Sequence, residues 1–246
     1  RDHPETDLII WPETAYPEIL DSNARVFDLF VLSINKPILT GAYSREFLEN
    51  SMKKDYNALF LLNSQAQRLS APYRKTYLLI FGETIHFVEQ FPWLAKYNPG
   101  GAGFSRGSGP MVMPFQDFQI GPQICYESLY PSFSAELVKK GADFLVNLTN
   151  DSWFGPTFEP KQHMIMTLAR TMEVRRPLIR STNTGFTSAA LADGSILAPG
   201  PLYKNWVGFF EINLLKNAPK TFYTQFGDWL LLPIFILFIL FITFFR

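Results

Sequence analysis

The sequence predicts an α/β fold in which helices cover strands that are buried on both faces. Short apolar runs, too short for typical helices, recur along most of the chain. Between several of them lie segments whose apolar residues are three or four positions apart, the spacing of one helix face. With 246 residues, 47% of them hydrophobic, the chain is long enough to bury a sizeable core. Alternation of buried strands with helices therefore favours α/β packing.

Strands are expected where an apolar run is bounded by proline, glycine or polar residues. The first, residues 7–11 (DLIIW), ends at Pro12, which lacks a backbone donor and restricts the residue before it. In chain order the expected strands are residues 7–11, 37–43, 57–63, 77–81, 111–113, 118–125, 144–147, 178–180, 187–191 and 207–212.

Three segments are expected to be helical, and these are residues 19–32, 131–140 and 161–175. The third has the clearest periodicity, because Met164, Leu168 and Met172 recur at helical spacing before Pro177 ends the pattern. Residues 91–110 (FPWLAKYNPGGAGFSRGSGP) are rich in glycine, proline and aromatic residues, so we expect an irregular segment there. Loops of this length are usually functional or disordered.

The carboxyl end differs from the rest of the chain. From Trp229 to Phe245 the sequence WLLLPIFILFILFITFF has no charged residue, and about 17 residues span roughly 25 Å as a helix. A buried core helix is the rival interpretation, but core helices usually carry a polar stripe. We therefore predict a catalytic domain over residues 1–225 and a transmembrane helix over residues 226–246, with Asp228 able to cap its start.

Composition excludes several classes of protein. The formal net charge is zero, which gives no electrostatic basis for a nucleic-acid partner. Cys125 is the only cysteine, so no internal disulfide framework exists. The three histidines (His3, His86 and His163) match no metal-ligand spacing, and we predict neither a metal nor another cofactor.

Three reactive or charged residues lie at the ends of expected strands: Glu13 after DLIIWP, Lys75 before YLLIF, and Cys125 after FQIGPQI. Side chains at strand ends point toward a common rim, where open α/β sheets place their sites. A carboxylate can accept the proton of a thiol, and a fixed cation can stabilise the oxyanion of an acyl-transfer intermediate. Each residue alone has a commoner structural explanation, an inert buried cysteine or an ordinary surface charge, so spacing leaves both interpretations open.

The segments around these residues resemble the nitrilase superfamily, and more closely its apolipoprotein N-acyltransferase family of the bacterial inner membrane. They occur in the order of that family and cover most of residues 7–215, and the tail before the apolar segment is similar too. The segments are IIWPETAYP (9–17), YRKTYLLIFGE (73–83), ICYESLYP (124–131), NLTNDSWFG (147–155), RSTNTGFTSAALADG (180–194) and FYTQFGDW (222–229).

This resemblance implies an α-β-β-α sandwich, followed here by the transmembrane helix. Within it Glu13 is the general base, Lys75 stabilises the oxyanion and Cys125 is the nucleophile. The chain begins at Arg1 and enters an apolar strand almost at once. We interpret it as a fragment that lacks the family's N-terminal strand and upstream membrane domain.

The resemblance also assigns roles to residues near the expected triad. Glu83 is required in this family, and Tyr126 and Glu127 flank the nucleophile as substrate-binding residues. This sequence has Ile80 where the family usually has proline before FGE, and Thr84 where it has tyrosine after it. Neither difference removes a reacting group, so only the local loop geometry is put in doubt.

The reaction implied is acyl transfer in the final step of bacterial lipoprotein maturation. A fatty acyl chain passes from a membrane glycerophospholipid, through a Cys125 thioester, to the amino-terminal amine of an S-diacylglyceryl-cysteine apolipoprotein. The resemblance places the catalytic domain on the periplasmic side of the inner membrane, in contact with the lipid bilayer. Two alternatives are a membrane-anchored amidase or other hydrolase of the same superfamily, and an inactive domain that binds lipid or lipoprotein.

Aromatic residues near these motifs suit an apolar substrate. Phe87, Phe91, Trp93, Leu94 and Phe104 belong to or adjoin the irregular segment and are candidates for a lid that reaches the membrane. Trp153 and Phe154 follow the Asn-Asp turn and are candidates for a pocket wall, although aromatic residues there serve a core equally well.

Overall fold

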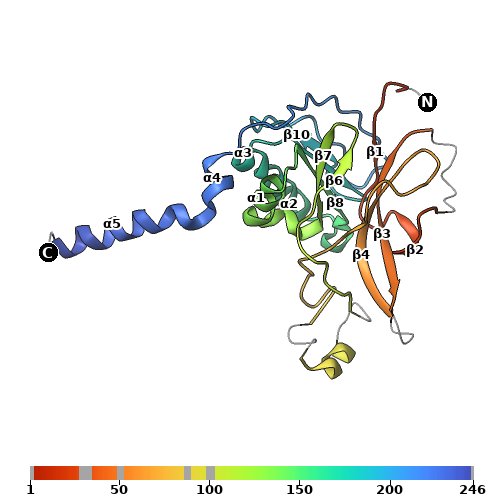
Figure 1. Cartoon of the computed structure of the whole chain (residues 1–246), viewed down its shortest axis with the longest axis horizontal. Coiled ribbons are helices and arrows are strands. Elements are labelled where there is room, and N and C mark those ends of the chain that lie inside the picture. Colours follow the sequence, from red (N-terminus) through yellow and green to blue (C-terminus); the bar gives the residue numbers. More distant parts are fainter. Residues whose placement is uncertain (1–2, 28–34, 49–52, 86–89, 98–102, 245–246) are drawn as a thin grey trace.

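A computed structural model of the chain describes residues 3–27, 35–48, 53–85, 90–97 and 103–244, and Figure 1 shows their arrangement. The first of two sheets contains β1 (Ile9–Ile10), β2 (Tyr16–Asp21), β3 (Ile38–Phe47), β4 (Lys53–Leu62) and β5 (Tyr73–Arg74). Its strand order is β1-β3-β4-β5, and β2 also pairs with β3. The long antiparallel pair of β3 and β4 forms the centre of this sheet.

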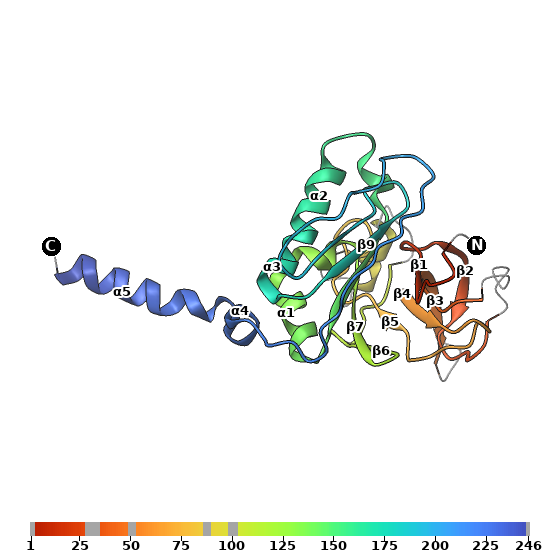
Figure 2. The same ribbon diagram turned by 90° about the horizontal axis from the view of Figure 1, so that it is seen from above.

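The second sheet has the order β10-β9-β8-β7-β6, and its three central strands are parallel. Its strands are β6 (Met113–Phe115), β7 (Phe118–Ile124), β8 (Phe144–Thr149), β9 (Leu178–Thr182) and β10 (Ser188–Ala190). Helix α1 (Pro131–Lys139) joins β7 to β8, and α2 (Glu159–Leu168) with α3 (Arg170–Val174) joins β8 to β9. Such crossovers place the helices on one face of the sheet, as Figure 2 shows.

The two sheets share one apolar core. Along β4 the side chains alternate, so that Leu59 and Leu61 enter the cluster formed with the second sheet and its helices. Ala58, Phe60 and Leu62 point the other way, into a smaller cluster with residues such as Phe27. In the described ranges the order of layers is helix, sheet, sheet. The second helical layer of the expected sandwich is not seen within them.

The helix expected over residues 19–32 is wrong for its described part, residues 19–27. Residues 16–21 form β2 instead, in which Tyr16 and Leu20 are buried and the residues between them are exposed. This strand pairs in parallel with β3. Apolar residues four apart suit a helix face and a bulged strand alike, and pairing with β3 decided between them. Residues 28–34 lie outside the described residues.

Two expected strands are also absent from the described chain at their positions. Residues 77–81 form a turn closed around the Leu79 carbonyl, which accepts hydrogen bonds from the backbone N–H groups of Gly82, Glu83 and Thr84. Residues 207–212 run as extended chain without strand pairing, and Val207 is 95% exposed there. Apolar composition alone does not supply the neighbouring strand that a β-strand needs. The other expected strands are present, with boundaries shifted by a few residues.

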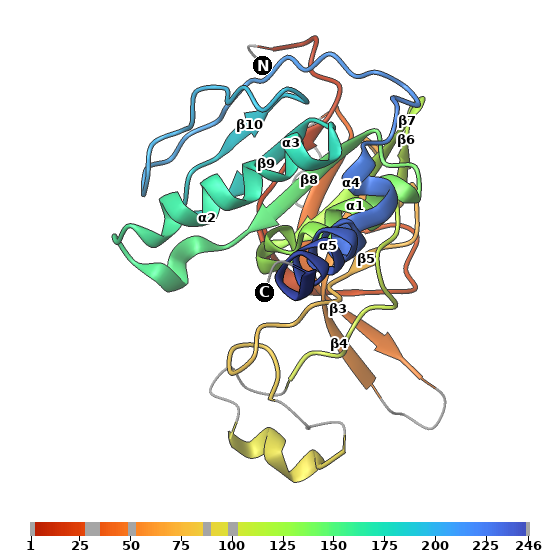
Figure 3. The ribbon, with the colours of Figure 1, turned by 90° about the vertical axis from the view of Figure 1, so that its left-hand side faces the viewer.

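Two further predictions need refinement. The helix expected over residues 161–175 is present but divides at Ala169 into α2 and α3. The irregular segment contains a short 3-10 helix, η2 (Pro92–Tyr97), drawn in yellow and set apart from the two sheets in Figure 3. The aromatic side chains of this helix are therefore away from the core.

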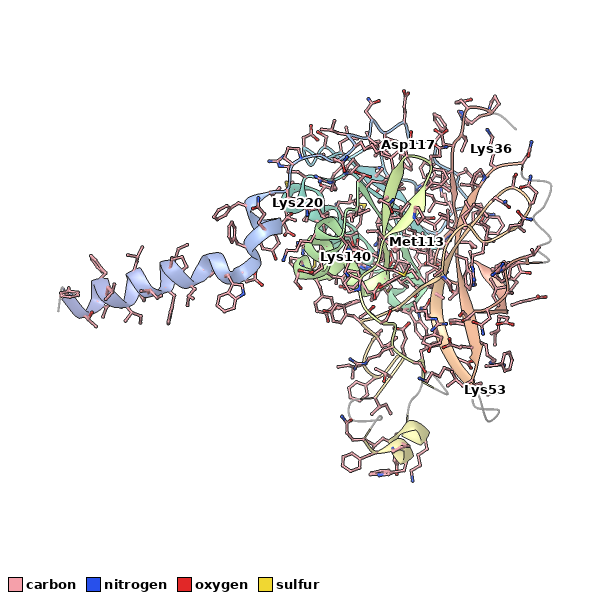
Figure 4. The ribbon with its side chains drawn as sticks, in the orientation of Figure 1. Lys36, Lys53, Met113, Asp117, Lys140 and Lys220 are labelled. Atoms are coloured by element: carbon pink, nitrogen blue, oxygen red, sulfur yellow. The ribbon has the colours of Figure 1, made fainter. Side chains whose placement is uncertain are left out.

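The carboxyl-terminal segment projects from the body of the protein. It consists of α4 (Phe222–Phe226), the 3-10 turn η5 (Gly227–Leu230) and α5 (Leu231–Phe244). In Figure 4 the side chains of α5 point outward all along the helix, and none of its described residues is buried. No single described helix is long and apolar enough to cross a membrane. The two pieces Phe222–Trp229 and Leu231–Phe244 pass that test together by length and composition, with a bend of 47° between them.

Gly41 on β3 allows the turn after β1 to approach the sheet closely. A Cβ atom at this position would lie 2.6 Å from the backbone nitrogen of Thr14 and 2.7 Å from Cα of Glu13. Both neighbours are backbone atoms, which cannot move aside as a flexible side chain would. The close approach therefore fixes where the Glu13 turn lies.

We predict that Gly41→Ala lowers the free energy of unfolding by about 1–3 kcal/mol, because a methyl group must be forced into packed backbone. Urea unfolding of the detergent-solubilised protein measures the change. Gln65→Ala, which truncates an exposed side chain in the turn after β4, is the control and should change the value by less than about 0.5 kcal/mol. Equal stabilities of the two variants would contradict this account of Gly41.

Candidate active site

The structure brings together the three residues that the sequence placed at strand ends. Glu13 lies in the turn after β1, Lys75 directly follows β5, and Cys125 directly follows β7 as the first residue of the 3-10 helix η3 (Cys125–Leu129). Two of them come from the first sheet and one from the second, so the site forms where the sheets meet. All three are buried, with exposed fractions of 6%, 2% and 9%.

Two carboxylates surround the Lys75 ammonium group. Its Nζ atom lies 3.5 Å from Oε1 of Glu13 and 2.8 Å from Oε2 of Glu83. The side-chain amide of Asn57 donates to both acids, at 2.7 Å to Glu13 and 2.9 Å to Glu83. Glu13 also accepts a hydrogen bond from the backbone N–H of Asn150 at 2.8 Å. The four side chains and this N–H form one connected network.

The charges of this network determine its protonation. Burial alone lowers the pKa of Lys75, but the neighbouring anionic groups, Glu13 first, outweigh burial and raise it above its ordinary value. Burial raises the pKa of Glu13, and the Lys75 charge only partly opposes that rise. Lys75 is therefore a permanent cation. Glu13 is a stronger base than a solvated carboxylate because desolvation makes its charged form less stable.

Cys125 has a backbone conformation that few residues adopt. Its φ angle is +51°, in the left-handed region, directly after an extended strand. Burial, followed by the charge of Glu13, raises the pKa of its thiol to about 12, against the opposing charge of Lys75. The thiol is therefore neutral at rest, and a nucleophilic attack requires transfer of its proton to a nearby base.

Glu127 is fully buried and makes four hydrogen bonds within the protein. Its Oε1 atom accepts from the Tyr73 hydroxyl at 2.7 Å and from the backbone N–H groups of Thr76 and Tyr77 at 2.6 and 3.1 Å. Its Oε2 atom accepts from the N–H of Ile124 at 2.8 Å. These contacts join the Cys125 segment to the Lys75 segment. They indicate that Glu127 positions the site, whereas its predicted contact with substrate stays a prediction.

The predicted aromatic residues fall into two groups. Tyr126 and Phe154 are partly buried near His163, at ring-centroid distances of 6.1 and 5.8 Å. Phe104 packs on Tyr43 at 5.0 Å, and its N–H donates to the Glu83 carbonyl, so it borders the acidic side of the site.

The other aromatic residues are exposed. Trp153 is 76% exposed, and Trp93, on η2, is 60% exposed. Trp93 packs against Tyr97 of its own helix, at a ring-centroid distance of 6.3 Å. The roles of both tryptophans in substrate binding remain predictions. Phe87 lies outside the described residues.

Sequence reasoning missed several buried polar residues near the site. The sequence predicts only that Asn57 and Asn147 belong to apolar strands. Arg180 is fully buried among Asp151 and His163, a histidine that no metal spacing explained. A charged or amide side chain within an otherwise apolar strand was the available signal, because such a group is buried only with a partner.

Comparison with known proteins agrees with this fold. The family model described as carbon-nitrogen hydrolase matches residues 1–214, so the chain belongs to that family. Solved structures of the same fold include a carbon-nitrogen hydrolase from Helicobacter pylori G27, with a TM-score of 0.59 and 14% identity, covering 83% of this chain and 76% of that one. A mutant of the amidase from Nesterenkonia sp. AN1 has a TM-score of 0.57 and 14% identity, covering 82% of this chain and 75% of that chain.

Within the family, the resemblance to apolipoprotein N-acyltransferases is confirmed. The chain is 51% identical over 239 residues to the apolipoprotein N-acyltransferase of Bdellovibrio bacteriovorus, covering 92% of this chain and 44% of that protein. It is 32% identical over 226 residues to that of Geobacter metallireducens, covering 91% of this chain and 43% of that protein. The chain thus spans a little under half the length of these relatives.

The buried carboxyl of Glu127 predicts a measurable pH dependence. Burial raises its pKa from 4.5 to about 7 in spite of the hydrogen bonds that lower it. Between pH 4.5 and about pH 7, Glu127 stays protonated in the folded protein but loses its proton in the unfolded chain. Protonation of Glu127 therefore adds to the free energy of unfolding at low pH, and this contribution is lost as pH rises through about 7. Glu127→Gln cannot titrate.

We therefore predict that the unfolding free energy of the wild type, minus that of Glu127→Gln, falls by about 2–3 kcal/mol between pH 5 and pH 8. Urea unfolding of both proteins at each pH measures this difference, in which the other titrating groups cancel. A difference that does not change with pH would mean that Glu127 is ionised throughout.

Proposed function

We propose that the protein is an acyltransferase that moves a fatty acyl chain through a thioester on Cys125. The observation that carries the proposal is the buried meeting of a thiol, a carboxylate and an ammonium group between the two sheets. Chemistry of this kind needs a nucleophile, a base and a cation for the oxyanion, with water excluded. Membership in the carbon-nitrogen hydrolase family and similarity to proteins named apolipoprotein N-acyltransferase support it.

In the first half-reaction the Cys125 sulfur attacks the ester carbonyl of a membrane glycerophospholipid while Glu13 accepts the thiol proton. The carbonyl π electrons move onto oxygen, where the Lys75 ammonium stabilises the negative charge. When the intermediate collapses, the C–O bond breaks and the departing oxygen takes the proton from Glu13. Lysophospholipid leaves, and the acyl group remains as a thioester.

The second half-reaction consumes this thioester. The amino-terminal amine of an S-diacylglyceryl-cysteine apolipoprotein attacks the thioester carbonyl and gives its proton to Glu13. The C–S bond then breaks, an amide forms, and the sulfur recovers the proton. Because an amide is more stable than a thioester, no nucleotide is needed. Kinetics of the ping-pong type follow from the covalent intermediate.

The carboxyl-terminal segment supports a lipid donor. Helix α5 carries apolar side chains on every side, and the aromatic residues Phe222, Phe226 and Trp229 precede it, all exposed. A helix that is apolar all round and unburied suits a lipid environment, and aromatic residues are enriched where such helices meet water. We propose that residues 222–244 enter the bacterial inner membrane and hold the catalytic domain at its periplasmic face.

We predict that protein incubated with a phospholipid carrying a labelled acyl chain acquires a label that hydroxylamine releases. Cys125→Ala should acquire none, because the nucleophile is gone. Cys125→Ser should lose at least about 100-fold in rate, because a carboxylate deprotonates a hydroxyl far less readily than a thiol. A wild-type protein that never acquires the label would refute the mechanism.

The same labelled protein identifies the acceptor. A diacylglyceryl lipopeptide should remove the label as an amide, whereas release as free fatty acid into water would favour a hydrolase. The lipopeptide blocked at its amino group is the matched control, and it should leave the thioester intact.

We also predict that Lys75→Arg lowers the rate of thioester formation by roughly 100-fold, because a guanidinium fork differs in reach and geometry from a point ammonium. Lys53→Arg is the control, since Lys53 is the exposed first residue of β4, labelled in Figure 4, and makes none of the contacts described for the site. Stopped-time labelling measures both. A Lys75→Arg protein with normal turnover would remove the oxyanion role from this residue.

A further inference from the structure

A second charged cluster lies behind Cys125, and the proposed reaction does not use it. Arg180 on β9 and Asp151 are each fully buried, and His163 on α2 is 1% exposed. One guanidinium nitrogen of Arg180 donates to Oδ2 of Asp151 at 2.8 Å, and Oδ1 of Asp151 lies 3.0 Å from Nδ1 of His163. Burying a charge this deeply costs free energy even when it is paired.

The other terminal nitrogen of Arg180 reaches toward Cys125 through Asn147. It donates to the side-chain oxygen of Asn147 at 2.6 Å, and the side-chain nitrogen of Asn147 donates to the Cys125 carbonyl at 3.1 Å. Asn147 and Arg180 are neighbours in the parallel register of β8 and β9. Arg180 thus determines which end of the Asn147 amide faces Cys125.

The Cys125 carbonyl accepts a second hydrogen bond, which leads back to the same residue. It comes from the Ser128 hydroxyl at 3.0 Å. That hydroxyl is 2.8 Å from the hydroxyl of Thr167, which accepts from Arg180 at 3.3 Å. Both of these hydrogen bonds therefore lead to one guanidinium group, and His163, a further neighbour of the Cys125 backbone, lies 3.2 Å from a nitrogen of the same group.

The Cys125 segment needs such restraint because its φ angle of +51° is unfavourable for a residue with a side chain. We propose that Arg180 is a positioning residue: through Asn147, and through Ser128 and Thr167, it holds the Cys125 carbonyl and so directs the sulfur toward Glu13 and Lys75. We name these four residues, Arg180, Asn147, Ser128 and Thr167, the Arg180 clamp. Its significance for catalysis rests on the proposed function, in which Cys125 is the nucleophile.

Asp151 keeps the guanidinium of the clamp in place. Its carboxylate contacts both Arg180 and His163, and Gly185 leaves it room, since a Cβ atom there would come within 1.9 Å of Oδ2. A lysine at position 180 has a single ammonium group and cannot reproduce the two-pronged contact with Asn147 and Asp151. Arg180→Lys therefore keeps the positive charge at this position but removes the contacts that orient Asn147.

The test is the rate at which iodoacetamide alkylates the protein, followed by mass spectrometry. Cys125 is the only cysteine, so one adduct reports on one sulfur. Arg180→Lys should alkylate at least about tenfold more slowly than the wild type, and kcat for acyl transfer should fall with KM for phospholipid unchanged, because misplacement of a reacting atom is costly. Arg176→Lys is the matched control, because Arg176 is 3% exposed and donates to backbone carbonyls that include Ala142 and Pro219, outside the clamp.

Asn147→Asp is the second variant and is informative even where Arg180→Lys does not fold. An aspartate at this position still accepts a hydrogen bond from Arg180. Toward the Cys125 carbonyl, however, it presents a carboxylate oxygen where Asn147 presents an N–H donor. Slow alkylation in Asn147→Asp, with a melting temperature no lower than that of Arg176→Lys, supports the clamp. Wild-type alkylation rates in both clamp variants, or an equal slowing in Arg176→Lys, overturn it.

Alkylation by iodoacetamide uses no lipid, so the experiments can refute the acyltransferase proposal and the clamp proposal independently of each other. A wild-type protein that forms no acyl thioester refutes the proposed function and leaves the alkylation comparison valid. Normal acyl transfer combined with normal alkylation in the clamp variants refutes the clamp alone.

Discussion

The candidate site depends on the burial of the Lys75 charge. Lys75 is 2% exposed, and an unpaired ammonium at this depth would be strongly destabilising. Glu13 and Glu83 supply the compensating charge, and the side-chain nitrogen of Asn57 donates a hydrogen bond to each of the two acids. Because these groups come from the turn after β1, from β4 and from the loop after β5, the balance of charge fixes three segments of the first sheet at once.

The second sheet adds the thiol to this prearranged charge. Its strands β7 and β8 end beside the first sheet, and Glu127 joins the two by accepting hydrogen bonds from both the Lys75 and Cys125 segments. The thiol rests as a neutral group because burial and the Glu13 charge disfavour the thiolate. In the proposed reaction this thiol gives its proton to Glu13, a stronger base than a solvated carboxylate because it is desolvated.

The body of the chain and its carboxyl-terminal helix differ in how they place their apolar side chains. The body buries its apolar side chains between sheets and helices, whereas α5 exposes all of its described side chains. No described part of the body covers this helix, which bends by 47° relative to Phe222–Trp229 at the end of the turn η5. In the proposed function, an acyl donor taken from a bilayer connects these two parts.

The sequence by itself determined the α/β class, most of the strands and the apolar tail, and it singled out Glu13, Lys75 and Cys125 as the candidate reacting groups. It did so because apolar periodicity and the ordered motifs around Glu13, Lys75 and Cys125 are local properties. It did not determine that residues 16–21 pair as a strand, or that residues 77–81 turn around Leu79, because both depend on partners distant in sequence. The sequence also could not predict the proposed Arg180 clamp. Each of its side chains is an ordinary polar residue in the sequence, and only the parallel strands and a helix bring them to one carbonyl. Burial and long-range pairing are tertiary properties, and only the folded structure decides them.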